Sequence, residues 1–229
     1  MAKAITFDFT APALLAHPNL LEAKKYKRNG KETGDAKFSA SFVLDADHPD
    51  LEPMKKTAIK AARELWPDRD IGAAFKAGEI VFPWKSGDKL ADKRVARLKK
   101  DGKEDDGKAD FMRGKIVIKA SSKFDVSLAA VVNGKIVDLD SLELKNRHKG
   151  LFYFGVKALG SVAFQAYDAV GGTDDAKDGV TAYLQCVLST GKGERIAGGV
   201  SAAERFKGYQ GSVSTESPTA GLEDDDIPF

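Results

Sequence analysis

The chain has 229 residues, a formal net charge of +2 and 42% hydrophobic residues, which suits one globular domain of generous size. A single cysteine, Cys186, excludes an internal disulfide framework and a multi-cysteine zinc site. No apolar run approaches the roughly 20 residues of a membrane span, and the N-terminus lacks the apolar region of a signal peptide. We therefore expect a soluble, cytoplasmic protein without a membrane partner.

The charges are distributed unevenly along the chain. All 36 Lys and Arg residues precede residue 216, whereas Glu216 and the acidic run from Glu223 to Asp226 come after all of them. The body is therefore more basic than the net charge suggests. A basic body with an acidic end is typical of a protein that binds a polyanion and whose tail imitates that polyanion.

The N-terminal part predicts two strands separated by a charged segment. Residues 5–9 form the first strand, and "KFSASFVL" alternates with Phe38, Ala40, Phe42 and Leu44 on one face. This second strand should be half-buried, with its other face in solvent. Between the two strands, "EAKKYKRNGKETGDAK" holds six basic residues and a Gly-rich turn, and we expect a surface loop there.

The pattern changes to a helical period from about Pro49. Apolar residues recur every three or four positions until Trp66, where Pro67 ends the helix because a residue before proline avoids the α region. Residues 67–110 are strongly charged and rich in Gly, so we expect a long insertion with one short helix near residues 91–98.

The rest of the body is rich in β-strand signals. Asn133-Gly134 lies between two β-rich runs and predicts a tight hairpin, and two further strands follow in "LFYFGVKALGSVAFQAYD" and "GVTAYLQCVLST". In the last strand, alternation places Cys186 inside with Val180, Ala182, Leu184 and Leu188. The chain therefore predicts a β-domain of five or more strands with one well-defined helix.

The outward-facing residues of these strands suggest a binding face. Tyr167 and Tyr183 share the outward phase on neighbouring strands, and Lys115 and Lys119 flank Val117 on one face of "KIVIK". A sheet face with aromatic rings, amides and lysines suits stacking of bases and contact with phosphates. Each of these tyrosines also fits a purely structural role, because Tyr is common on exposed sheet faces.

The sequence resembles the bacteriophage single-stranded DNA-binding proteins that have an OB-fold and an acidic tail with a terminal aromatic residue. The likeness rests on "GKIVIKASSKF", "GLFYFGVKALGSVAFQAYDAVGG", "GVTAYLQCV" and the closing "EDDDIPF". It implies a mainly β fold with one or two helices: a five-stranded, partly open Greek-key barrel with long insertions and a disordered acidic tail. The implied division is an OB-fold domain over residues 1–212 and a flexible tail over residues 213–229.

The resemblance also implies a function. The protein would bind single-stranded DNA (ssDNA) with little sequence preference during phage DNA replication and recombination, in the host cell cytoplasm, and protect it. Its tail would recruit replication proteins such as a polymerase, a helicase or primase, or a nuclease. The insertion around residues 67–110 departs from a compact OB domain and leaves the extent of the binding groove open.

Binding of ssDNA requires cations for the phosphates and aromatic faces for unstacked bases. The insertion offers both, because Trp84 and Lys85 are followed by Lys89, Lys93, Arg94, Arg97, Lys99 and Lys100. Trp84 either anchors its loop to the core or stacks on a base. The candidate ssDNA contacts are Trp84, Lys85, Arg97, Arg113, Lys115, Lys119, Lys123, Tyr153, Tyr167 and Tyr183.

The tail has two candidate roles, which do not exclude each other. Its carboxylates can occupy the basic groove when DNA is absent, and its apolar end can enter the pocket of a partner protein. A merely solubilising tail is the plainer alternative, and the apolar end argues against it. The candidate partner-binding residues are Glu223, Asp224, Asp225, Asp226, Ile227, Pro228 and Phe229.

Other functional classes have weaker support in the sequence. Asp138, Asp140, Glu143 and Lys145 resemble the loose layout of a Mg²⁺-dependent nuclease, but the stretch fits a strand end and a charged turn more simply. The three histidines lie in separate segments without metal-ligand spacing, and no Gly-rich phosphate loop is present, so we expect no enzyme, metal site or cofactor. A strand-annealing or duplex-binding accessory protein would show the same basic surface and remains an alternative.

Overall fold

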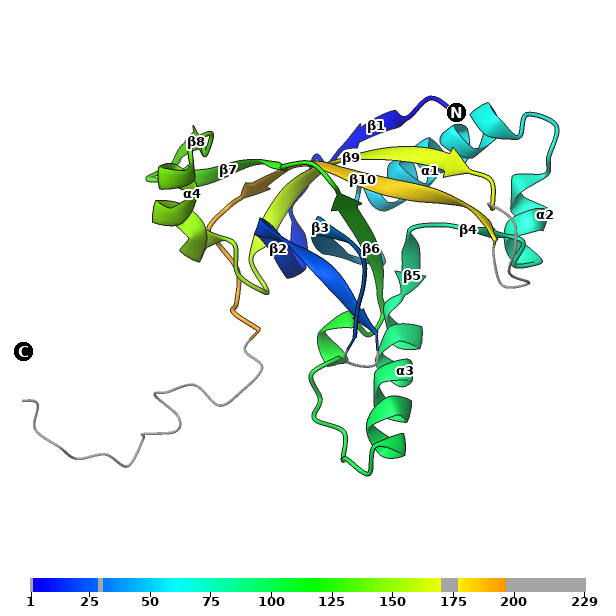
Figure 1. Cartoon of the computed structure of the whole chain (residues 1–229), viewed down its shortest axis with the longest axis horizontal. Coiled ribbons are helices and arrows are strands. Elements are labelled where there is room, and N and C mark those ends of the chain that lie inside the picture. Colours follow the sequence, from blue (N-terminus) through cyan, green and yellow to red (C-terminus); the bar gives the residue numbers. More distant parts are fainter. Residues whose placement is uncertain (1, 29–30, 170–176, 197–229) are drawn as a thin grey trace, which may run out of the picture. The chain divides into compact units, whose positions relative to one another are not determined.

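Figure 1 shows the computed structural model, which describes residues 2–28, 31–169 and 177–196. Within these ranges, no helix is long and apolar enough to cross a membrane. The N-terminal half contains β1 (Ile5–Asp8), β2 (Ala13–Arg28), β3 (Lys31–Asp45), α1 (Leu51–Leu65), α2 (Ile71–Lys76), β4 (Ile80–Val81), β5 (Trp84–Ser86) and α3 (Gly87–Lys100). The C-terminal half contains η1 (Asp110–Met112), β6 (Lys115–Ser122), β7 (Ser127–Val132), β8 (Lys135–Asp138), α4 (Leu142–His148), η2 (Lys149–Leu151), β9 (Lys157–Tyr167) and β10 (Asp178–Ser189).

Five strands close into a barrel in the order β2-β3-β6-β10-β9 and back to β2. The pairs are antiparallel except for β6 and β10, which run parallel. In chain order, the third barrel strand (β6) pairs with the fifth (β10), and the fourth (β9) pairs with the first (β2). This is the Greek-key connectivity of the OB-fold. The predicted mainly β fold with a five-stranded barrel is confirmed, and the pairing of β9 with both β2 and β10 closes it.

The main core fills the barrel and continues under α1. Phe42, Leu15, Leu44 and Phe164 are fully buried inside it, and α1 adds the buried face predicted by its period, including Met54. The start of α1 is tied to the N-terminal segment through the buried carboxylate of Asp50. That carboxylate accepts hydrogen bonds from the Thr10 hydroxyl at 2.6 Å and from the Thr10 and Ala11 backbone N–H groups at 2.9 Å.

The segment expected to be a surface loop, residues 22–37, instead belongs to a long hairpin. β2 and β3 continue pairing as far as Arg28 and Lys31, beyond the barrel itself. Sequence reasoning missed this arm because charged residues occupy both of its faces, so no alternation marks the strands. Figure 1 shows the arm reaching toward α3.

Residues 67–110 contain more structure than the single short helix expected there. The helix predicted near residues 91–98 is confirmed as part of the longer α3, while β4 pairs with β10 and β5 with β6. The structure has four α-helices in its described residues rather than one or two, because α2 and α4 are too short to show a period. Leu90 of α3, together with Phe111, packs on Val43 and Val117, so the face of β3 expected to be solvated is partly covered.

The C-terminal strands follow the predicted alternation except at one point. Asn133 and Gly134 both have positive φ and join β7 to β8, as the predicted tight hairpin requires. The prediction for Cys186 is wrong: its side chain is exposed and Val187 is buried instead. The pairing of β10 with β9 shifts register between Leu184 and Cys186, and this irregularity reverses the phase of the following residues.

Candidate nucleic-acid interface

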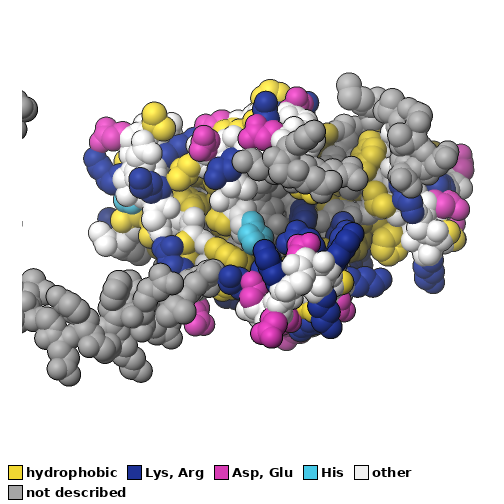
Figure 2. Space-filling view, turned by 60° about the horizontal axis from the view of Figure 1, so that its bottom comes forward, with side chains coloured by type: hydrophobic (Ala, Val, Ile, Leu, Met, Phe, Trp, Pro, Cys, Tyr) yellow, Lys and Arg dark blue, Asp and Glu magenta, His cyan; other side chains and the backbone are white. Residues whose placement is uncertain are grey.

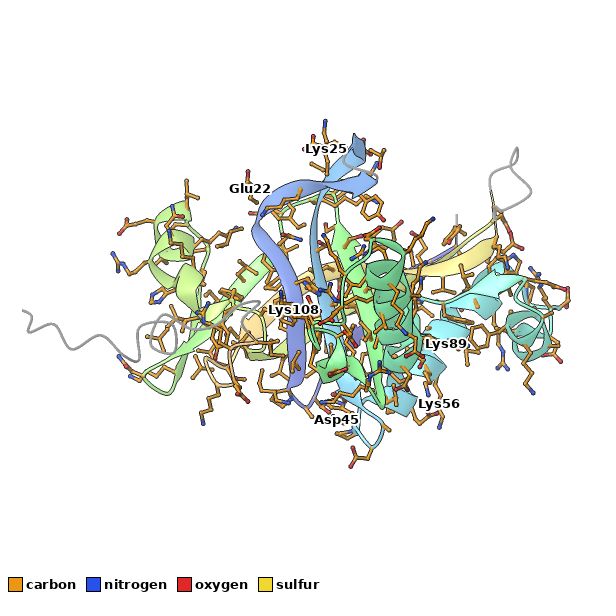
Figure 3. All side chains as sticks on the ribbon, turned by 90° about the horizontal axis from the view of Figure 1, so that it is seen from below. Glu22, Lys25, Asp45, Lys56, Lys89 and Lys108 are labelled. Atoms are coloured by element: carbon orange, nitrogen blue, oxygen red, sulfur yellow. The ribbon has the colours of Figure 1, made fainter. Side chains whose placement is uncertain are left out.

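A groove of about 1140 Å³ lies on the outer face of the barrel, between its first three strands and α3. Ser41 of β3 and Val117 and Lys119 of β6 are among the residues on the sheet side, and α3 forms the facing wall. Figure 2 shows Lys and Arg side chains gathered around this hollowed region, and Figure 3 shows Lys89 on α3 and Lys25 near the tip of the hairpin. The groove therefore combines a rigid sheet face, a helix and the hairpin arm.

The lining of the groove is strongly basic. Among the described residues that line it, none is Asp or Glu. Lys89, Lys93 and Arg97 recur at every fourth position of α3, which places them on one face of the helix. The seven cations that line the groove are Lys85, Lys89, Lys93, Arg94, Arg97, Lys100 and Lys119.

Lys119 lies on the sheet side of the groove, where two other cations oppose its positive charge. Burial by the surrounding groove lowers its pKa, and the positive charges of Lys85 and Lys93 lower it further. Its side chain nevertheless remains accessible from the open side of the groove. A bound phosphate would relieve this repulsion, because an anion favours the protonated form of an amine.

One end of the groove carries an aromatic wall. Trp84 of β5 stacks on Phe82 with ring centroids 4.3 Å apart, and Phe75 of α2 meets Phe82 edge-on at 5.3 Å. Phe75 remains 45% exposed, and Tyr26 on the hairpin arm is 71% exposed. Trp84 packs against the core and also lines the groove, so stacking on a base stays a prediction.

His17 enters the groove through a bulge in β2. Ala16 pairs with Ser41 and Asn19 with Ser39, so β2 advances three residues while β3 advances two. His17 has a φ of 48°, in the left-handed region that non-Gly residues seldom occupy. Backbone strain of this kind costs about 1–3 kcal/mol and persists where the surrounding structure holds it in place.

The structure gathers four of the predicted contacts in the groove and places three predicted cations outside it. Trp84, Lys85, Arg97 and Lys119 line the groove. The other three cations form ion pairs with nearby carboxylates, which neutralise their charge in the unbound protein. Arg113 bonds Asp92 at 2.9 Å and Asp110 at 3.1 Å, Lys115 bonds Asp45 at 3.0 Å, and Lys123 bonds Asp35 at 2.5 Å.

The three predicted tyrosines also lie outside the groove. Tyr183 and Tyr167 are 45% and 41% exposed on the outer sheet face, as their phase predicted. Tyr183 pairs with Ser121 of β6, next to the sheet side of the groove. Tyr153 belongs to the periphery of the core, where its hydroxyl donates a hydrogen bond to the Gly193 carbonyl at 2.8 Å and Arg195 covers its ring.

The groove residues with aromatic rings that sequence reasoning missed are His17, Tyr26 and Phe75. Tyr26 stood in the segment taken for a loop, and Phe75 stands in a helix too short for a periodic signal. His17 precedes Pro18, and a His-Pro pair inside a strand pattern is a signal for a bulge that sequence reasoning did not use.

The remaining candidates are placed as follows. The tail residues Glu223 to Phe229 lie outside the described residues. Within the nuclease-like stretch, Glu143 is paired with Arg147 and Lys145 with Asp125, each at 2.6 Å. No cluster of three or more His, Cys, Asp or Glu side chains suited to a metal ion occurs within the described ranges.

A closed barrel of this topology, with a basic and aromatic groove across its first three strands, has the fold and the site chemistry of an oligonucleotide-binding protein. The model of the family described as "Enterobacter phage Enc34, ssDNA-binding protein" matches residues 9–217, and the chain belongs to this family. No curated protein sequence matches the chain.

Solved structures agree with the family at the level of the fold. The single-stranded DNA-binding protein from bacteriophage Enc34 is similar with a TM-score of 0.53 and 13% identity over 89% of each chain. The same protein in complex with ssDNA gives a TM-score of 0.51 and 14% identity, over 85% of this chain and 89% of that chain. Its C-terminal truncation gives 0.50 and 16%, over 84% and 88%.

Proposed function

We propose that this protein binds ssDNA in the groove between α3 and the barrel, with little sequence preference. The observation that carries the proposal is the set of seven groove cations, combined with exposed aromatic rings at the groove end. Cations attract the phosphates of any sequence, and aromatic faces stack on any base, at about 1–3 kcal/mol per base. The solved ssDNA complex of the Enc34 protein supports the same assignment.

The groove suits a single strand better than a duplex. The rings of Trp84 and Phe75 can stack only on bases that are not already stacked in a helix. We propose that Tyr183 extends the path, since Ser39, Ser121 and Tyr183 form a row across the sheet beside the groove. Arg113, Lys115 and Lys123 would contribute only where a phosphate displaces the carboxylate partners described above, and Tyr153 and Tyr167 would be peripheral contacts.

The role we propose is binding without chemistry, in phage DNA replication and recombination in the host cytoplasm. Bound protein would shield the strand from nucleases and from refolding. The paired states of Glu143 and Lys145 argue against their use as a catalytic pair. Strand annealing or duplex binding remains the second candidate, because the same cations would attract duplex phosphates.

Competition binding tests this proposal. A fluorescent dT oligomer is titrated with the protein and then challenged with unlabelled dT, duplex and RNA of equal length, at two salt concentrations. We expect dT to compete best and the affinity to fall steeply with salt. Equal competition by duplex would favour the accessory-protein alternative, and Mg²⁺-dependent cleavage that is lost in Glu143→Ala would favour the nuclease.

We further propose that residues 213–229 form a tail outside the domain of residues 1–212, and that this tail recruits replication proteins. Deleting residues 223–229 removes four side-chain carboxylates, so affinity for ssDNA should rise, most at low salt where screening is weakest. Deleting Phe229 alone should leave DNA binding unchanged and abolish capture of replication proteins. Both roles are wrong if the longer deletion binds no tighter and still captures the same proteins.

A further inference from the structure

His17 occupies a position in the groove that the proposed contacts do not explain. The bulge in β2 and its positive φ direct the imidazole to the groove rather than into the barrel core. The ring of Phe154 supports it from one side, with centroids 4.7 Å apart. A strained backbone that presents one polar ring to a binding groove indicates a functional demand.

The groups around His17 are positively charged or neutral. Lys119 faces it from β6 and Arg94 from α3, while β3 contributes the neutral Ser41. Arg94 bonds Asp106 at 2.7 Å, and this hydrogen bonding lowers the pKa of the Asp106 carboxyl to about 2. Asp106 therefore stays ionised, is shared between Arg94 and Lys108, and is not among the residues lining the groove.

This environment keeps the free imidazole neutral at pH 7. Burial lowers the pKa of His17 below its usual 6.5, and the charges of Lys119 and Arg94 lower it further. A DNA phosphate in the groove brings a negative charge to the same place, which favours the protonated ring. The surrounding protein therefore lowers the pKa of His17, whereas bound DNA raises it.

We propose that His17 is a proton-linked contact to bound nucleic acid: its imidazole takes up a proton from solvent when phosphates enter the groove, and then donates a hydrogen bond to them. This inference rests on the proposed ssDNA-binding function and adds a pH dependence to it. Affinity rises as pH falls through the interval between the higher pKa of the bound state and the lower pKa of the free state. The groove thus binds more tightly at mildly acidic pH.

Few other groups can produce the same signal. Between pH 5.5 and 7.5 the ordinary lysines, arginines and carboxylates do not titrate, and thymine bases are neutral. His48 lies outside the groove, beside Asp50 with its Nδ1 accepting a hydrogen bond from the Asp50 backbone N–H at 3.2 Å. His148 lies at the end of α4, and neither residue lines the groove. Lys119 also lines the groove and its pKa is also lowered, so the variant His17→Asn decides which of the two groups takes up the proton.

The variant His17→Asn tests the proposal with little disturbance of the backbone. Asn tolerates the left-handed conformation better than most residues and has no proton to gain in this pH range. His148→Asn is the matched control. Calorimetric titration with a dT oligomer at pH 6, in two buffers of different ionisation enthalpy, gives the number of protons taken up. Affinity is measured in parallel from pH 5.5 to 7.5.

We expect the wild type and His148→Asn to take up a fraction of a proton, and their affinity to rise by about threefold to tenfold toward low pH, since one pKa unit corresponds to tenfold. His17→Asn should show neither effect. Tight binding by the wild type without proton uptake, or unchanged uptake in His17→Asn, would overturn this inference and leave ssDNA binding intact. Failure to bind dT at every pH would refute the proposed function as well.

Discussion

The cationic face of α3 offers the sharpest test of the groove. Lys93 and Arg97 stand four residues apart on this face and line the groove. Like charges at this spacing cost an isolated helix a few tenths of a kcal/mol, so their arrangement does not serve the stability of α3. Replacing both with Gln keeps good helix formers and removes two phosphate contacts. We expect weaker ssDNA binding without loss of folding stability.

The magnitude follows from the seven cations that line the groove. If each contacts one phosphate, the log-log salt slope is about 5, at about 0.7 per contact. Raising salt from about 50 to about 200 mM would then weaken the wild type by about 10³-fold. For Lys93→Gln/Arg97→Gln, five contacts remain, the slope falls to about 3.5 and the loss over the same range to about 10²-fold.

The assay is fluorescence titration of a dT oligomer at several salt concentrations. Lys99→Gln is the matched control, because Lys99 is an exposed lysine of the same helix that does not line the groove. Thermal unfolding of all three proteins separates binding from folding. A wild-type slope in the double variant, or the same reduction in Lys99→Gln, would refute the groove as the binding site.

Three further predictions concern single side chains. Phe75→Ala should weaken ssDNA binding by about 1–3 kcal/mol in fluorescence titration, whereas the exposed Phe124, which does not line the groove, should tolerate the same change; equal effects would refute the aromatic wall. Gly160→Ala should lower the free energy of unfolding by about 1–3 kcal/mol in urea titration, because a Cβ there would collide with the Phe42 ring; an unchanged midpoint would contradict that packing. Burial opposes ionisation of Asp50, but the hydrogen bonds to its carboxylate lower its pKa below 3.8 overall. The stability that ionised Asp50 contributes is therefore present above about pH 4 and is lost as pH falls through the folded-state pKa. Asp50→Asn should be less stable than the wild type at pH 7, and unfolding curves measured in acid should show this difference shrinking.

Sequence patterns identified the elements whose signals are local. The helix from Leu51 to Leu65 follows from its apolar period, and the β7–β8 hairpin follows from Asn133-Gly134. The outward phase of Tyr167 and Tyr183 follows from simple alternation. In each case the residues that decide the structure lie within a few positions of one another, so no tertiary information is needed.

The groove depends on contacts that no local pattern contains. Cys186 is exposed because a pairing irregularity with β9 shifts the phase of its own strand. The hairpin arm has polar faces on both sides, so only its pairing defines it. His17 and Phe75 meet in one groove although they lie in distant parts of the sequence, and neither alone has a feature that predicts binding. The cation-rich segments of the sequence indicated a site that binds an anion. Which of these cations lie together in the groove depends on how the barrel folds.

The closure of the barrel by β9 also orders events during synthesis of the protein. Every described residue that lines the groove lies between Ala16 and Lys119, yet the strands that complete the barrel, β9 and β10, begin only at Lys157 and Asp178. Pairing between β2 and β9 joins distant parts of the chain, and such non-local contacts form late in folding. A growing chain therefore carries all the groove cations before it has a barrel to position them, and the synthesis of β10, the last strand of the described residues, decides when the barrel can close.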